Sequence, residues 1–216
     1  KEAEDLAVSK LRLNHRDAIF PYLGLCRLYL SMGRYVEAKS CCEQAVSLGE
    51  KLPTIEPQLM ADALGSSVNL QILNEEYQEA QGLLERALAI RLKLAGPELP
   101  PTGLALNDLG AVLEGQGDYV SARKLHHRAL RAVAPPLGPT HRENAKVLSS
   151  LSRVYEMLSL SASDSTQTRL TLLQALSFSK RALDIQRAIH GTESVEYADA
   201  LRAIAQIRVG LRQHLG

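Results

Sequence analysis

Hydrophobic and small residues recur along the chain with two periods. Within segments of helix length they follow the 3.6-residue period of an amphipathic helix, and the whole pattern then repeats every 42 residues. The repeat is carried by two sets of alanines and one of tyrosines: Ala38, Ala80 and Ala122; Ala45, Ala87 and Ala129; Tyr35, Tyr77 and Tyr119. Self-similarity at this spacing predicts an array of helix pairs in which each pair stacks on the next.

The register predicts one array over the whole chain. Residues 1–14 read as the end of an earlier repeat, so the chain is expected to enter and leave the array within a repeat. The fourth repeat carries an 11-residue insertion near 159–169, because Tyr155 and Ala175 are 20 residues apart where the other copies have 9. Its polar, Ser/Thr-rich sequence predicts a surface loop with an extended helix. The expected repeats are about 19–60, 61–102, 103–144 and 145–197, followed by a partial or capping helix over 198–216.

Each copy places small residues where two helices must approach closely. Counting repeat position 1 at Ile19, Ala61, Gly103, Ala145 and Ala198, position 8 is Cys26 in the first copy and Gly110 in the third. Alanine holds positions 20 and 27, and small side chains there allow close helix contact. A glycine at position 15, Gly33 or Gly117, permits the backbone to reverse between the two helices.

The stretch RALAIRLKLAGPELPPTGLALNDLG, residues 86–110, resembles the tetratricopeptide repeat of the kinesin light chain type. In that type a RALEIRE-like helix end is followed by a linker and a first helix that opens LNNLA. The resemblance covers nearly the whole chain. It implies an all-α, right-handed superhelical α-solenoid of antiparallel helix pairs, with the first helices lining a concave groove.

The resemblance also implies where a partner would bind. Positions 2, 5, 6, 9, 12 and 13 of the first helices face the groove in this class. Asn107 keeps the position-5 asparagine whose amide can hydrogen-bond a peptide backbone, and the other copies lack it. The candidate partner-binding residues are Phe20, Leu23, Arg27, Asn69, Asn107, Lys146, Ser149, Arg153 and Arg202.

The C-terminal part of this groove is the more charged part. Lys146, Arg153 and Arg202 are candidates to meet an acidic segment of a partner, and nearby Glu114, Glu156 and Asp199 would neutralise part of their field. The alternative is that these side chains are solvated groove walls or form ion pairs with one another. The pattern of Lys, Asn and Arg that clamps acidic C-terminal tails in co-chaperone repeats is missing at the matching positions, which excludes that mode.

Composition and charge exclude several other classes of function. The net charge is +1 and only 4% of residues are aromatic, which disfavours a nucleic-acid surface. No apolar run reaches the length of a membrane span, so no membrane partner is expected. Three cysteines, Cys26, Cys41 and Cys42, lack a framework spacing and are interpreted as small, buried, reduced side chains of a cytoplasmic protein.

The tandem histidines His126 and His127 are the most conspicuous candidates for chemistry. The repeat register assigns His126 to the packed position 24 and His127 to position 25, about 100° further around the helix and toward solvent. No nucleotide-binding, zinc-protease or nucleophile-elbow motif occurs. We therefore predict no catalytic residue, no metal site, no cofactor and no small-molecule substrate.

The sequence thus predicts a non-catalytic scaffold or adaptor that binds a protein or peptide segment in its groove. One alternative is a structural assembly subunit whose groove is filled by its own chain or by another subunit. A second is a regulatory sensor array attached to a catalytic or nucleotide-switch domain outside this chain.

Overall fold

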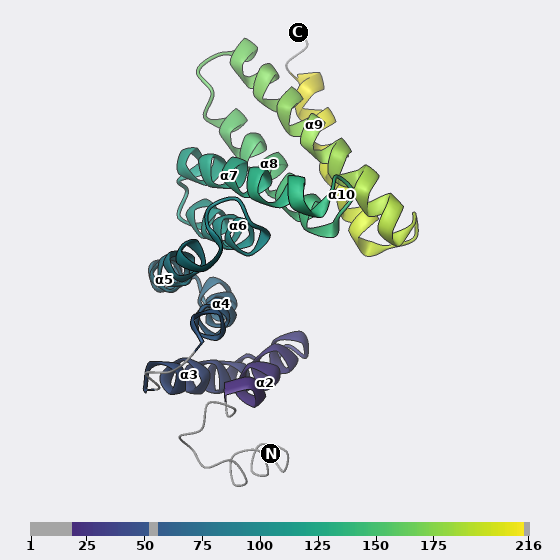
Figure 1. Ribbon diagram of the computed structural model, residues 1–216. Coiled ribbons are helices and arrows are strands. Elements are labelled where there is room, and N and C mark those ends of the chain that lie inside the picture. Colours follow the sequence, from purple (N-terminus) through teal and green to yellow (C-terminus); the bar gives the residue numbers. More distant parts are fainter. Residues whose placement is uncertain (1–18, 52–55, 214–216) are drawn as a thin grey trace. The chain divides into compact units, whose positions relative to one another are not determined.

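The repeat pattern translates into helices in the computed structural model, which describes residues 19–51 and 56–213, without the side chains of Asn69 and Leu73. Every regular element in this described part is a helix (Figure 1). The partial repeat expected at 1–14 lies outside the described residues. The helices are α2 (Ile19–Ser31), α3 (Tyr35–Lys51), α4 (Pro57–Leu73), α5 (Tyr77–Ala95), α6 (Pro100–Gly115), α7 (Tyr119–Leu137), α8 (Arg142–Leu160), α9 (Ser165–His190) and α10 (Val195–Gln213).

Consecutive helices pack as pairs within two compact units that divide between Gly96 and Pro97. In the first unit α2 packs on α3 and α4 on α5, and α3 also contacts α4. In the second unit α6 pairs with α7 and α8 with α9, while α7 contacts α8 and α10 packs on α9. The division of the chain into repeats with the bounds given above stays a prediction.

The tight turns between paired helices use a left-handed backbone conformation at repeat position 15. Its φ is +70° at Gly33 and +84° at Gly117. In the second copy the same position is Glu75, the one described non-glycine residue with positive φ, at +60°. Because a side chain disfavours this region, the glycines fit the turn and Glu75 adopts it at a cost.

The helix starts also follow local chemistry. Asp118 caps α7 by accepting a hydrogen bond from the backbone N–H of Ser121 (3.0 Å), and Asp164 caps α9 through Gln167 N–H (2.7 Å). A proline stands in the first turn of α4 and of α6, where a missing N–H costs no hydrogen bond.

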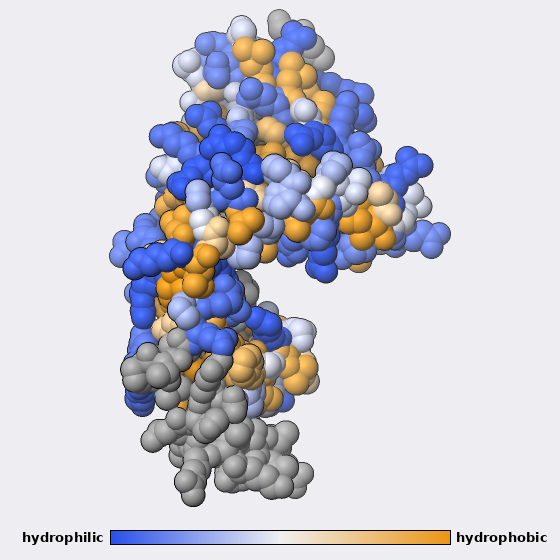
Figure 2. Space-filling view, in the orientation of Figure 1, coloured by the Kyte–Doolittle hydropathy of each residue, from blue (hydrophilic) through white to orange (hydrophobic). Residues whose placement is uncertain are grey.

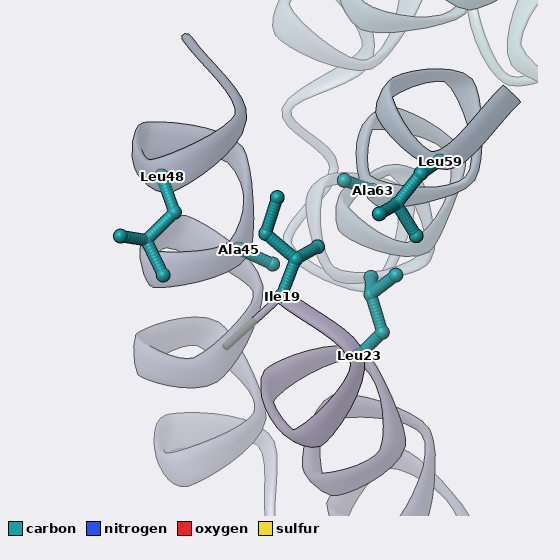
Figure 3. Close-up of a cluster of buried hydrophobic side chains, with 6 residues drawn as sticks. All are labelled: Ile19, Leu23, Ala45, Leu48, Leu59 and Ala63. Atoms are coloured by element: carbon teal, nitrogen blue, oxygen red, sulfur yellow. The ribbon is translucent and has the colours of Figure 1, made fainter. Parts of the chain in front are cut away.

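The core of the first unit forms where three helices meet (Figure 3). Small and large apolar side chains alternate there, so that the close approach at an alanine leaves room for a leucine or isoleucine beside it. The cluster consists of Ile19 and Leu23 from α2, Ala45 and Leu48 from α3, and Leu59 and Ala63 from α4.

Most of the inserted residues in the fourth copy are helical. Only residues 161–164 separate α8 from α9, and α9 is 26 residues long, against 19 for α7. The insertion therefore lengthens the second helix of that pair at its N-terminal end.

Cys26 and Cys42 correct one interpretation made from the sequence. They occupy positions 8 and 24 of the first copy, where α2 and α3 touch, and the structure joins them as a disulfide with Cα atoms 5.4 Å apart. The interpretation as reduced side chains is therefore wrong for this pair, because close helix packing brought together two residues that are 16 apart in sequence. All three cysteines are buried, as expected.

Hydrophilic residues predominate on the face shown in Figure 2, and hydrophobic residues appear there as separate patches. Among the described helices, none is long and apolar enough to cross a membrane.

Candidate protein-binding groove

The second unit contains a cleft between α8 and α10, with α9 as its floor. Its volume is about 490 Å³, within the range of roughly 300–1,000 Å³ typical of ligand pockets. The described residues contain no group of three or more His, Cys, Asp or Glu side chains arranged to hold a metal ion. The cleft is lined by Lys146, Ser149, Ser150, Ser152, Arg153 and Glu156 of α8, by Ser179, Ala182 and Gln186 of α9, and by Glu196, Asp199, Ala200, Ala203 and Gln206 of α10.

Three residues predicted from the sequence line this cleft together. Lys146, Ser149 and Arg153 follow one another by three or four residues along α8, which places them on one helix face. Arg202 is highly exposed on α10 but is not among the lining residues.

The predicted residues of the first unit fall into different environments. Phe20 is 55% exposed and Arg27 is exposed, so both present surface to solvent. Leu23 is only 5% exposed and packs in the cluster of Figure 3. Its assignment as a groove wall is therefore corrected to a packing residue, because α4 covers the face that the register had left open. The side chain of Asn69 lies outside the described part.

Asn107 makes a contact within the chain through its side-chain oxygen. Its Oδ1 lies 3.0 Å from Nδ1 of His126, whose side chain is fully buried. His126 also meets Glu114 through Nε2, at 2.7 Å. The carbonyl oxygen of Asn107 is thus turned toward α7, and the hydrogen bond of its amide to a partner peptide stays a prediction.

The three cationic side chains expected to attract an acidic segment are all neutralised from within the chain. Each forms an ion pair with a carboxylate: Lys146 with Glu143 (3.1 Å), Arg153 with Glu114 (2.6 Å), and Arg202 with Asp199. Mutual ion pairs, one of the alternatives that the sequence leaves open, are therefore present, and attraction of an acidic segment stays a prediction.

Glu114 is the centre of the most buried of these interactions. Its side chain is 8% exposed and accepts two hydrogen bonds from the Arg153 guanidinium, from Nε at 2.6 Å and Nη2 at 3.2 Å. Burial raises the pKa of Glu114, but the hydrogen bonds from His126 and Arg153 outweigh burial and hold it below its ordinary value. One carboxylate thus ties α6 to both α7 and α8.

His127 is not directed at solvent as predicted. Its Nε2 lies 2.9 Å from the hydroxyl of Tyr155, and its ring makes edge contacts with Tyr155 and Phe178. Burial, together with the charges of Arg123 and Arg131, lowers the pKa of His127. The prediction is wrong because it considered α7 alone, and the neighbouring pair α8 and α9 covers that side of it.

The floor of the cleft was missed by sequence reasoning. Ser179, Ala182 and Gln186 stand at positions 24, 27 and 31 of the fourth copy, and none of them is among the binding candidates taken from the sequence. Their spacing of three and four residues was a usable signal, since it places them on one face of α9.

Comparisons with known proteins agree with this fold. A family model described as "Tetratricopeptide repeat" matches residues 59–134 and 103–162. The solved structure described as "Podosopora anserina putative kinesin light chain nearly identical TPR-like repeats", a variant with one substitution, superposes with a TM-score of 0.71 at 20% identity, covering 92% of this chain and 89% of that chain. BtubC (BKLC) from P. vanneervenii gives a TM-score of 0.61 at 16% identity, covering 98% and 87%.

A curated relative is the human "Clustered mitochondria protein homolog", 29% identical over 133 residues. The match covers 61% of this chain and only 10% of the relative, so the chain spans about a tenth of that protein's length. Helix pairs, repeat spacing and matched family model together define an all-α solenoid of repeated helix pairs. Residues 59–162 thus resemble tetratricopeptide repeats, and the described helices have the fold of the TPR-like repeats in these solved structures.

Proposed function

We propose that this chain is a non-catalytic scaffold or adaptor that binds a segment of a partner protein along the exposed faces of its first helices. The observation that carries the proposal is the cleft of about 490 Å³ between α8 and α10, which gathers Lys146, Ser149 and Arg153 on one wall. Small residues on the facing wall, Ala200 and Ala203, leave room for a chain to lie between the helices. An extended partner segment would then be recognised both by hydrogen bonds to its backbone and by pockets for its side chains.

A random-peptide display library selected on the chain tests this proposal. Selected peptides are expected to lose at least about tenfold in affinity when Ala203→Arg fills the cleft, since tenfold corresponds to only about 1.4 kcal/mol. The matched control is Gln174→Arg, which adds the same side chain at an exposed position of α9 outside the cleft. Equal affinity of the selected peptides for wild type and Ala203→Arg would refute the groove assignment.

An acidic partner segment is the finer version of this proposal, and it has its own test. It requires Lys146, Arg153 and Arg202 to attract carboxylates although each already pairs with one. If the partner segment is acidic, replacing all three cationic residues with glutamate weakens the binding of acidic peptides by more than the few tenths of a kcal/mol typical of single exposed pairs. If calorimetric titration shows unchanged affinity, the hypothesis of an acidic partner segment is rejected, while the groove proposal still stands.

A further inference from the structure

The cleft between α8 and α10 is lined by both cationic and anionic side chains. Its cationic lining residues, Lys146 and Arg153, are held by Glu143 and Glu114, which do not line it. Their positive charges are therefore paired with carboxylates outside the cleft.

The anionic lining residues are in a different position. Asp199 pairs with Arg202, but no ion pair is recorded for Glu156 or Glu196 in the part of the chain that the structure describes. Burial raises the pKa of Glu156, as expected for a carboxyl group with no donor near enough to stabilise its charge. Glu156 thus lies in the cleft wall as an acceptor without a matching cation.

A second acceptor lies on the floor. The Oε1 atom of Gln186 is buried and has no hydrogen-bond partner among the described residues. A buried acceptor without a donor is unfavourable, and a ligand that brings a donor would relieve it. Gln186 on α9 and Glu156 on α8 therefore present two acceptors from adjoining walls of one cleft.

We propose that this cleft receives an arginine side chain from a partner protein segment. A guanidinium fits because its five N–H donors point in several directions, so one group can bond a carboxylate and an amide oxygen together. Glu196 and Asp199 on the α10 wall add negative charge that complements it. The inference rests on the proposed function and names the partner chemistry as basic, opposite to the acidic segment expected from the sequence.

Nuclear magnetic resonance titration of the 216-residue chain with N-acetyl-arginine amide tests the inference directly. We expect saturable shifts at the Gln186 side-chain amide and at the backbone amides of Glu156 and Ala203. N-acetyl-citrulline amide, which has nearly the same shape without the charge, is expected to bind at least about tenfold more weakly, because it cannot form an ion pair with the cleft carboxylates.

Two variants sharpen the test. Glu156→Gln removes one cleft carboxylate and should weaken the arginine probe about tenfold or more. Glu193→Gln removes an equal charge at an exposed position outside the cleft and should leave the affinity unchanged. Equal binding of arginine and citrulline probes, or equal effects of the two variants, would overturn the inference.

The peptide display separates this inference from the proposed function. Selected peptides that lose affinity on Ala203→Arg but contain no enriched arginine refute the arginine site while the groove stands. If the selected peptides bind Ala203→Arg with the same affinity as wild type, the groove proposal itself is refuted.

Discussion

At the scale of single residues, Gly110 and His126 fit closely against each other. The His126 ring is fully buried, and a Cβ built on Gly110 would lie 2.5 Å from its Cε1 and 2.8 Å from its Nδ1. Position 8 is therefore glycine in this copy because position 24 is an imidazole rather than a smaller side chain. The two positions form one packing unit across α6 and α7.

Gly110→Ala is expected to lower the free energy of unfolding by about 1–3 kcal/mol, the usual cost of overpacking a core. Adding His126→Ala should recover part of that loss, because the clash disappears, so the two changes will not be additive. Urea denaturation measures the free energy of unfolding of the single and the double variant. Gly82→Ala is the control, since no atom lies within 4 Å of the new Cβ on α5 and the change should be neutral or stabilising. Strict additivity would contradict the packing pair.

Glu75 offers a stabilising change at the same scale. Its φ of +60° is the conformation that Gly33 and Gly117 adopt in the matching turns. Glu75→Gly is therefore expected to raise the free energy of unfolding by about 1 kcal/mol by relieving backbone strain. Thermal unfolding followed by circular dichroism should show a higher Tm. Gly117→Ala should lower it by a similar amount, and a Tm that falls in both variants would count against this reading.

At the scale of elements, the first helices are joined through buried polar contacts as well as apolar ones. Glu114 near the end of α6 meets His126 of α7 and Arg153 of α8. Because its pKa is lowered on folding, the folded chain favours the ionised form. The resulting stability is fully present above the unfolded pKa of about 4.3 and is lost as pH falls through the lower folded value.

Glu114→Gln should therefore destabilise the chain most at neutral pH. We expect a loss of about 1–3 kcal/mol at pH 7, typical of an unsatisfied buried donor, because His126 and Arg153 lose their charged acceptor. The difference from wild type should shrink as pH falls below the unfolded pKa of about 4.3 and through the lower folded pKa, where the wild-type carboxyl group becomes protonated in the folded chain. Urea unfolding at several pH values measures it, and a difference that grows toward acid would show that Glu114 is not ionised in the folded chain.

At the scale of the whole molecule, the 42-residue register predicted the helix pairs, their turns and the small residues between them, and the structure has all of these. Those features depend on contacts within one repeat. Because these contacts recur in every repeat, the residues that make them recur in the sequence with the same period. The interpretation of His127 failed for the opposite reason. Its partners Tyr155 and Phe178 belong to the next pair, and a pattern within one repeat does not specify contacts between pairs.

The candidate groove shows the same division. The sequence by itself determined that α8 would present Lys146, Ser149 and Arg153 on one face, since helix geometry decides this. Only the tertiary structure decided that Arg153 would reach Glu114, 39 residues earlier, and that Gln186 would complete the cleft from α9. Charge pairing and burial depend on which atoms meet when repeats stack, and a repeat pattern specifies the stack without specifying its unique side chains.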